Sequence, residues 1–309
     1  MTNRVAVMDL GTNTFHLLIA ESDPTRFFKE VLHEHVGVKL GEGGINEGTI
    51  KADAYQRGID TLVSFHQFIR QHNVHSIKAI ATSAMRSASN GQQFIDEVKQ
   101  HTGIVIETIN GDREAGYIYA GVKASRCLQE ANSLIVDIGG GSVEFILGNQ
   151  REIIYKQSFE IGAARLMAKF HQTDPISVDE VAALNDYLDL QLAPMCDAVK
   201  KHNVQSLIGS SGAFETFAEL AERHNGHSFD LKQTPTYAFK EGNLLEITRK
   251  IIHSNHEERA AMPGILPVRV DMIVVSSLLM QYVMHKLNLH QVVMSAYSLK
   301  EGVLAEMFK

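Results

Sequence analysis

The sequence predicts an α/β protein made of two similar halves, each a mixed sheet flanked by helices. Two observations carry this prediction. A strand, glycine turn, strand pattern occurs twice, and each copy is followed by strand-like segments that alternate with helix-like ones. Hairpins joined to such alternating segments give mixed sheets with helices packed on them. Two halves of this kind leave a cleft between their glycine turns.

The clearer copy of the pattern spans residues 134–147, LIVDIGGGSVEFIL. Its turn holds three glycines and a serine: Gly139, Gly140, Gly141 and Ser142. Glycines let the backbone turn several N–H groups toward one point, which makes an anion-binding cradle. A strand follows the turn, whereas a helix follows the turn of a Walker or Rossmann loop. We therefore expect these four residues to bind phosphate.

Two carboxylates flank this turn. Asp137 ends the first strand, and Glu144 lies two residues after Ser142. Because alternate strand residues share a face, Glu144 can reach the side of the turn where Asp137 stands. Two carboxylates beside a phosphate would repel it unless a hard cation lay between them, and Mg²⁺ is the usual one. Asp137 and Glu144 are the predicted metal ligands.

The second copy spans residues 5–20 and lies 128 positions earlier, so that Asp9, Gly11 and Thr14 match Asp137, Gly139 and Ser142. The segment HNVHS at 72–76 recurs as HNVQS at 202–206, 130 positions later. Two pairs at nearly one separation indicate a tandem duplication of a unit of roughly 130 residues. We expect Gly11, Asn13 and Thr14 to bind phosphate from the first half.

Apolar periodicity and turn residues predict the remaining elements in order. In the first half we expect strands at 27–40, 77–81 and 104–109, and helices at 51–70, 94–101 and 113–125. The second half should have strands at 153–159, 207–209 and 292–294. Its expected helices are 163–170, 177–200 with an interruption at Pro194, 213–224, 244–253, a helix to 286 opened by Arg269 and Asp271, and 299–308.

Composition excludes several classes of protein. A chain of 309 residues with 44% hydrophobic and 21% charged residues is typical of a globular protein of about two domains. Its longest mainly apolar run, 272–284, is too short to span a bilayer, and no secretory signal is visible. A net charge of −7 argues against a nucleic-acid partner. Two cysteines without a CxxC motif favour the cytoplasm. The fifteen histidines lack metal-site spacing, and we expect the pairs His33/His35, His72/His75 and His253/His256 on surface strands or helix ends.

The chain resembles the exopolyphosphatase and guanosine pentaphosphate phosphohydrolase (Ppx/GppA) family. The matching motifs are DLGTNTFHLLIA from Asp9, ATSAMR with Arg86, GDREAGYIYAGV with Glu114, DIGGGSVE from Asp137, GSSGAFE from Gly209, RVD from Arg269 and KEGVL from Lys300. The resemblance implies two tandem actin-like domains (ASKHA, ribonuclease H-like) with mixed sheets around an interdomain cleft. We expect domains at 1–125 and 126–298, with helix 299–309 packed back on the first.

The resemblance also implies an activity, the Mg²⁺-assisted release of terminal phosphate from polyphosphate or guanosine pentaphosphate (pppGpp). Glu114 corresponds to the family's catalytic base, and Arg86 is expected to contact phosphate. Arg113 stands where an acidic residue is commoner, and it could either lower the pKa of Glu114 or contact a phosphate. Lys300 replaces a more usual arginine, for which we expect no chemical consequence. The family analogy leaves a homodimer open.

Two other functions stay open from the sequence. A sugar or acetate kinase would share the hairpins but would transfer phosphate to an acceptor, without need of the Glu114 motif. A non-catalytic sensor would bind pppGpp or another nucleotide without turnover. Because the chain is acidic and lacks a long C-terminal extension, we expect short polyphosphate or pppGpp to serve at least as well as long chains.

Overall fold

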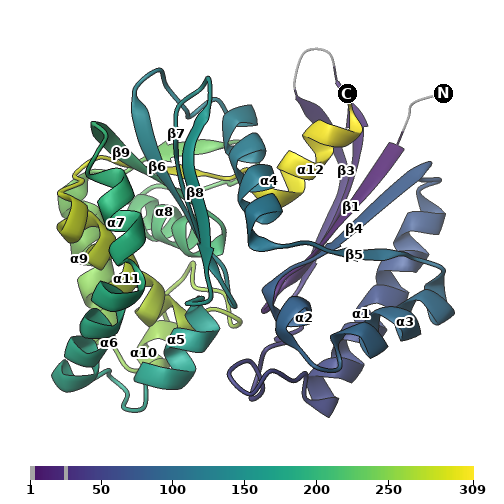
Figure 1. Cartoon of the computed structure of the whole chain (residues 1–309), viewed down its shortest axis with the longest axis horizontal. Coiled ribbons are helices and arrows are strands. Elements are labelled where there is room, and N and C mark those ends of the chain that lie inside the picture. The colour runs from purple at the N-terminus through teal and green to yellow at the C-terminus, as the bar shows by residue number, and fades with distance from the viewer. Residues whose placement is uncertain (1–3, 24–26) are drawn as a thin grey trace.

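A computed structural model describes residues 4–23 and 27–309. Residues 1–3, the start of the predicted first domain, and 24–26 lie outside the described part. The described chain forms two mixed sheets with helices packed on them (Figure 1). One sheet has the strand order β3-β2-β1-β4-β5, and the other has the order β10-β11-β9-β6-β7-β8. This confirms the predicted α/β fold of two actin-like halves.

The first half contains, in order, β1 (Arg4–Leu10), β2 (Phe15–Ser22), β3 (Phe28–Val36), α1 (Ala52–Gln71), β4 (Ser76–Ala81), α2 (Ser83–Ser87), α3 (Gly91–Thr102), β5 (Ile106–Thr108) and α4 (Gly111–Ala124). The expected strand at 27–40 is shorter than predicted, because the chain leaves the sheet after Val36. Helix α2 follows β4 directly and was not predicted, since five residues are too few to show helical periodicity.

The second part of the chain contains β6 (Asn132–Ile138), β7 (Val143–Gly148), β8 (Ile153–Phe159), α5 (Ala163–Phe170), α6 (Val178–Gln191), α7 (Ala193–Val199), β9 (Val204–Ser210), α8 (Gly212–His224), β10 (Thr236–Ala238), α9 (Glu241–His253), α10 (His256–Ala260), α11 (Met272–Leu287), β11 (Val292–Ser295) and α12 (Leu299–Met307). The predicted capping box of Ser177 is present, and Pro194 lies in the first turn of α7, where proline is tolerated.

The two hairpins share the same register. Leu10 pairs with Phe15 across the first turn, and Ile138 pairs with Val143 across the second, so each turn spans four residues. In both halves the third strand extends the hairpin antiparallel, and the fourth strand pairs in parallel with the first, β4 beside β1 and β9 beside β6. This shared topology is what a tandem duplication predicts.

Helices α4 and α12 lie between the two sheets (Figure 1). One cluster of buried hydrophobic residues contains side chains from these helices and from both sheets, including Ile80 of β4 and Ile135 of β6. The two helices approach so closely that a side chain on Gly302 would lie 1.8 Å from the carbonyl oxygen of Tyr117. Helix α12 also packs on β1. The last helix of the chain therefore lies against the first half and helps to join the two sheets.

No helix among the described residues is both long enough and apolar enough to cross a bilayer.

Candidate active site

The two glycine turns touch each other. A side chain on Gly140 would lie 3.1 Å from Cβ of Thr12, and one on Gly141 would lie 2.5 Å from Oγ1 of Thr12. Within the first turn the Gly11 N–H donates to the Thr14 carbonyl at 3.2 Å. Glycine is favoured in the second turn because the Thr12 side chain of the first turn packs directly against it. The predicted phosphate-binding turns are therefore brought together.

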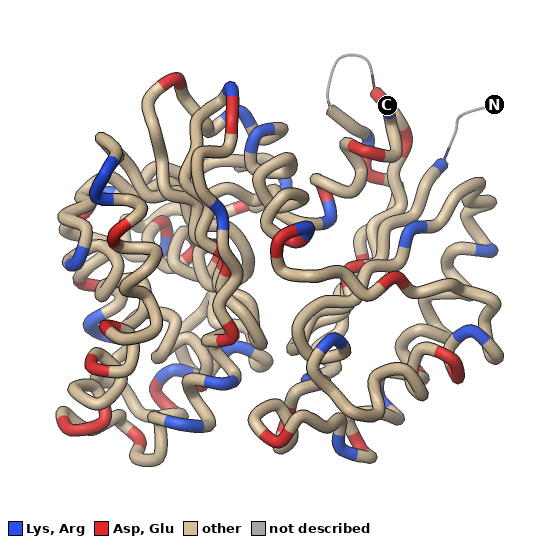
Figure 2. The backbone as a smooth tube through the Cα atoms, viewed as in Figure 1, with Lys and Arg blue, Asp and Glu red and all other residues tan. Residues whose placement is uncertain are grey.

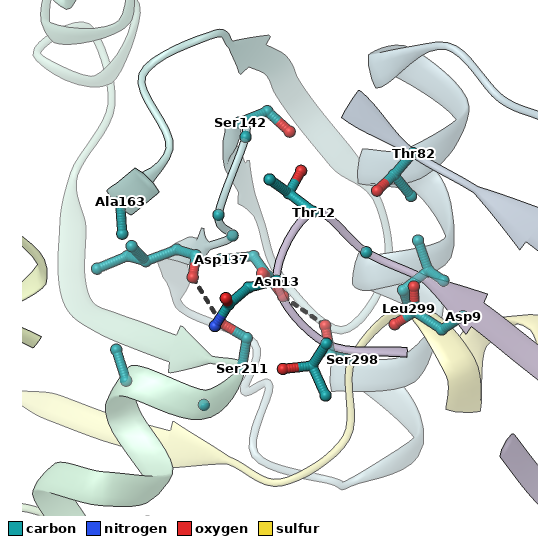
Figure 3. Close-up of a pocket in the computed structure, with 18 of the residues that line it drawn as sticks. Asp9, Thr12, Asn13, Thr82, Asp137, Ser142, Ala163, Ser211, Ser298 and Leu299 are labelled. Carbon is teal, nitrogen blue, oxygen red and sulfur yellow. Dashed lines mark hydrogen bonds between the residues drawn. The ribbon is translucent and has the colours of Figure 1, made fainter. Parts of the chain in front are cut away.

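A cavity of about 170 Å³ lies where the turns meet, lined by residues from both halves. Figure 3 shows Thr12, Asn13 and Ser142 gathered around it together with Asp9 and Asp137. Ten of the predicted site residues line this cavity: Gly11, Asn13, Thr14, Glu114, Asp137, Gly139, Gly140, Gly141, Ser142 and Glu144. Arg86 is not among the residues that line it.

Asp137 and Glu144 face each other directly across the β6–β7 ladder. Both are buried, with 6% and 1% of their surface exposed. Asp137 accepts hydrogen bonds from Ser298 and from Ser210 Oγ at 2.6 Å, and Glu144 accepts one from Ser158 Oγ at 2.7 Å. Burial raises the pKa of both carboxyl groups, and the neighbouring carboxylates raise that of Glu144 further.

Glu114 lies in the first turn of α4 and is 6% exposed. Its Oε2 accepts a hydrogen bond from Arg86 Nη1 at 3.0 Å. Burial raises the pKa of Glu114 to about 8, although the Arg86 guanidinium opposes the rise, and the carboxylates of Asp9 and Asp137 add to it. A carboxyl group with a pKa near neutrality and a hydrogen-bonded partner is suited to proton transfer.

Arg86 is engaged by groups from both halves. One nitrogen, Nη1, donates to Glu114 and to the Ile109 carbonyl at 3.0 Å, and the other, Nη2, donates to Glu160 Oε1 at 2.8 Å. Its contact with phosphate stays a prediction, since in the structure its partners are carboxylates and a carbonyl.

Arg113 is not among the residues that line the cavity. It forms an ion pair with Glu107, and its Nη2 donates to the Tyr117 hydroxyl at 2.9 Å. Of the two roles that the sequence left open, the structure supports neither, because Arg113 ties α4 to the end of β5.

Several residues that line the cavity were not assigned a role from the sequence. Lys300, expected to be without chemical consequence, lines the cavity with 11% of its side chain exposed, and its positive charge opposes the rise in the pKa of Asp9. Arg269 also lines the cavity and pairs with Glu215 at 3.1 Å, whereas Asp271 pairs with Arg259. The prediction of an Arg269–Asp271 helix opening holds only in part, because α11 begins at residue 272 and the two residues have different partners.

His16 occupies the position in the first hairpin that Glu144 occupies in the second. It pairs across the strands with Asp9, as Glu144 pairs with Asp137. Its Nδ1 lies 3.3 Å from His33 Nε2, and burial and the Lys300 charge lower the pKa of His16 well below its ordinary value. His16 is therefore neutral, and the first hairpin carries one carboxylate where the second carries two.

Residues 18–309 match the Ppx/GppA phosphatase family. The chain belongs to this family. It is 26% identical to "Exopolyphosphatase 2" of Mycobacterium tuberculosis over 97% of both chains. It is also 31% identical, over 90% of its own length, to 43% of a "Bifunctional 3-dehydroquinate synthase/phosphatase" of Fusobacterium nucleatum.

Solved structures of the family agree with the fold. An exopolyphosphatase from Cytophaga hutchinsonii superposes with a TM-score of 0.95 at 39% identity, covering 99% of this chain and 97% of that one. The Aquifex aeolicus Ppx/GppA member gives a TM-score of 0.82 at 25% identity, covering 100% of this chain and 98% of that one. The Ppx/GppA chain described here is thus a family member over nearly its whole length.

The donor set of this Ppx/GppA chain fits a magnesium ion shared with a substrate. Among the described residues no three His, Cys, Asp or Glu side chains converge as a complete metal cage. Mg²⁺ is commonly held by one or two carboxylates and completed by phosphate oxygens and water. Asp137 and Glu144, two buried carboxylates that face each other across the ladder, fit that mode of binding.

Acidic and basic residues are interspersed over both halves (Figure 2). Charged residues of both signs also line the cavity: the acidic Asp9, Glu114, Asp137, Glu144 and Glu215, and the basic Arg269 and Lys300.

Proposed function

We propose that this phosphatase-family chain is an exopolyphosphatase-type hydrolase that releases terminal phosphate from polyphosphate, from pppGpp or from both. The observation that carries the proposal is the placement of Glu114 in a cavity that also holds both glycine turns and the Asp137–Glu144 pair. A proton acceptor, an anion cradle and a cation site are the parts that phosphoanhydride hydrolysis requires. Several relatives are named exopolyphosphatases, which supports polyphosphate as the substrate class.

In the proposed reaction the substrate chain lies with its last phosphate between the two turns. Backbone N–H groups at Thr12 to Thr14 and at Gly139 to Ser142 bind its oxygens, Gly11 shapes the first turn, and Asn13 adds a side-chain donor. A rigid cradle of this kind fixes the terminal phosphorus for in-line attack. Arg269 and Lys300, which line the same cavity, supply positive charge for a polyanion.

Glu114 takes a proton from a water molecule as that water attacks the terminal phosphorus. The bond between this phosphorus and the bridging oxygen breaks, and the remaining chain leaves with the electron pair. Asp137 and Glu144 would hold Mg²⁺, which would supply positive charge for the phosphate oxygens. General-base catalysis of this kind is worth typically about 10²–10⁴-fold in rate.

The substrate ranking follows from charge and shape. Long polyphosphate carries about one negative charge per phosphate and would gain most from an extended basic channel. The chain has a net charge of −7, and Lys and Arg positions alternate with Asp and Glu positions along the backbone of both halves (Figure 2). We therefore propose that short polyphosphate or pppGpp is hydrolysed at least as fast as long chains.

The test measures phosphate release from short polyphosphate, long polyphosphate and pppGpp, each with Mg²⁺ and with EDTA, for the wild type and Glu114→Gln. Mg²⁺-dependent release that is lost in the variant is the expected result. Faster, processive release from long chains would contradict the ranking. No release from any of the three would refute the hydrolase and favour an acceptor-dependent kinase or a binding-only sensor.

A further inference from the structure

Glu160 reaches across the cleft and joins three polar side chains. It follows β8 in the second half, and its Oε1 accepts a hydrogen bond from Arg86 Nη2 at 2.8 Å. Its Oε2 accepts one from Ser83 Oγ at 2.6 Å and one from Arg165 Nη2 at 2.8 Å. Ser83 and Arg86 belong to α2 of the first half. A single carboxylate of one half is thus fixed to two residues of the other.

Arg165 extends this connection. From α5 of the second half it donates to the Ile45 carbonyl at 2.8 Å and to Ser87 Oγ at 3.2 Å, both in the first half. It also donates to the Gly141 carbonyl at 2.8 Å, which links the connection to the second phosphate turn. These bonds form only when the halves are as close as they are in this structure.

Arg86 stands between two carboxylates that belong to different halves. Its planar guanidinium offers donors in a fixed fork, so fixing one nitrogen sets the direction of the other. Glu160 binds Nη2, and Nη1 then points to Glu114 at 3.0 Å. Among the described residues, Glu160 is the one hydrogen-bond acceptor of Nη2. The Ile109 carbonyl of the first half also accepts from Nη1 at 3.0 Å, so Glu160 supplies the second fixed point of the guanidinium, from the opposite half.

We propose that Glu160 is a positioning residue that holds Arg86 on Glu114 when the cleft is closed, an inference that rests on the proposed function of Glu114 as the base. Because Glu160 reaches Arg86 only when the two halves are close, closure of the cleft also aligns the base Glu114. Opening of the cleft removes Glu160 from Arg86. Arg86 and Glu114 both belong to the first half, so they remain neighbours but lose the contact that fixes the guanidinium. The base is then poorly oriented whenever the cavity is open to bulk water.

A double-mutant cycle tests this directly, because it separates action through Arg86 from a general effect on closure. Steady-state hydrolysis is measured for the wild type, Glu160→Gln, Arg86→Gln and the double variant. We expect Glu160→Gln to lower kcat about tenfold with KM changed less than about threefold. That is the lower end of what a charged hydrogen bond contributes, since the Glu160 side chain is 47% exposed. In the Arg86→Gln background the same change should cost less than about twofold.

Equal losses in both backgrounds, or a loss confined to KM, would overturn the proposal, because Glu160 would then act only in holding the halves together. Glu130→Gln is the matched control, since Glu130 pairs with Arg151 on the exposed surface and should leave kcat unchanged. Glu160→Asp keeps the charge on a shorter side chain, so its kcat should fall less than that of Glu160→Gln. In the Arg86→Gln background Glu160→Asp should cause no further loss of kcat.

A measurement without substrate keeps this proposal separate from the proposed function. The guanidinium signal of Arg86 in ¹⁵N NMR, assigned through Arg86→Gln, should show faster rotation in Glu160→Gln than in the wild type. An unchanged signal refutes the positioning by Glu160 even if hydrolysis is confirmed. Failure of the wild type to release phosphate, by contrast, refutes the function and leaves this test to decide whether Glu160 orders Arg86.

Discussion

Replacement of Glu114 by glutamine should abolish most turnover without unfolding the protein. Glutamine has nearly the same shape and can still accept a hydrogen bond from Arg86, but it cannot take a proton from water. The expected loss is the contribution of general-base catalysis, about 10²–10⁴-fold in kcat, or roughly 3–5 kcal/mol of barrier. Binding of the substrate should change little, because the turns that hold phosphate are untouched.

The same substitution should change how stability depends on pH. Burial raises the pKa of Glu114 from its ordinary 4.5 to about 8, so the folded protein holds a proton that the unfolded chain has released. Stability from this group is complete below about pH 4.5 and is lost as the pH rises to about 8. At about 1.4 kcal/mol per pH unit, the loss is on the order of 5 kcal/mol. Glu114→Gln removes this component, so its unfolding free energy should fall less with pH.

Both effects are measured on the same preparations. Phosphate release is followed at saturating short polyphosphate with Mg²⁺, and urea unfolding is followed from pH 5 to pH 9 in EDTA. Glu130→Gln, an exposed substitution of the same chemistry, should match the wild type in both. Turnover of Glu114→Gln within about threefold of the wild type would remove Glu114 as the base. An unchanged pH dependence of stability would show that Glu114 does not carry the buried proton.

Three further results are expected. The rate should rise with pH, reach about half its maximum near pH 8 and level off above it, because Glu114 must be charged to act. A rate that falls in a pH series as the pH rises toward 8 would oppose that role. Glu144→Gln removes one of two paired buried carboxylates. In a Mg²⁺ titration this variant should need at least about tenfold more Mg²⁺ for half-maximal activity, and in EDTA it should be more stable than the wild type. Gly141→Ala should lower kcat/KM about tenfold in a steady-state assay, because its Cβ would lie 2.5 Å from an atom of the other turn, whereas Gly242→Ala, with no atom within 4 Å, should be neutral.

The hairpins and their turns could be predicted because their signals are local. Apolar alternation marks the strands, and a glycine cluster between two such runs marks a turn, so the sequence identified both loops that line the cavity. The repeat then indicated that the two loops face each other. Short elements lacked such signals: β10 has three residues and is held only by pairing with β11. Helix α10, with five residues, likewise shows no periodicity.

The connections across the cleft could not be predicted in the same way. Glu160 lies 74 positions from Arg86, and nothing in either local sequence indicates the other. From the sequence, the replacement of arginine by Lys300 is expected to have no chemical consequence, because a motif states which residue is usual and not which side chains surround it in the fold. Its burial beside Asp9 and Glu301 follows from the packing of α12 between the sheets. Such residues are found only once the halves are placed together.

The two hairpins differ in charge, so the two sides of the cavity are not equivalent. Asp9 and Asp137 occupy equivalent strand positions, but their cross-strand partners are the neutral His16 and the carboxylate Glu144. A duplicated pair of carboxylates would present two equivalent cation sites and would repel a phosphate chain from both sides. Replacing one carboxylate by an imidazole, with Lys300 near Asp9, leaves the excess negative charge on the second hairpin. A cation is therefore expected on the side of Asp137 and Glu144, and a bound phosphate chain should lie with its uncompensated oxygens toward Lys300.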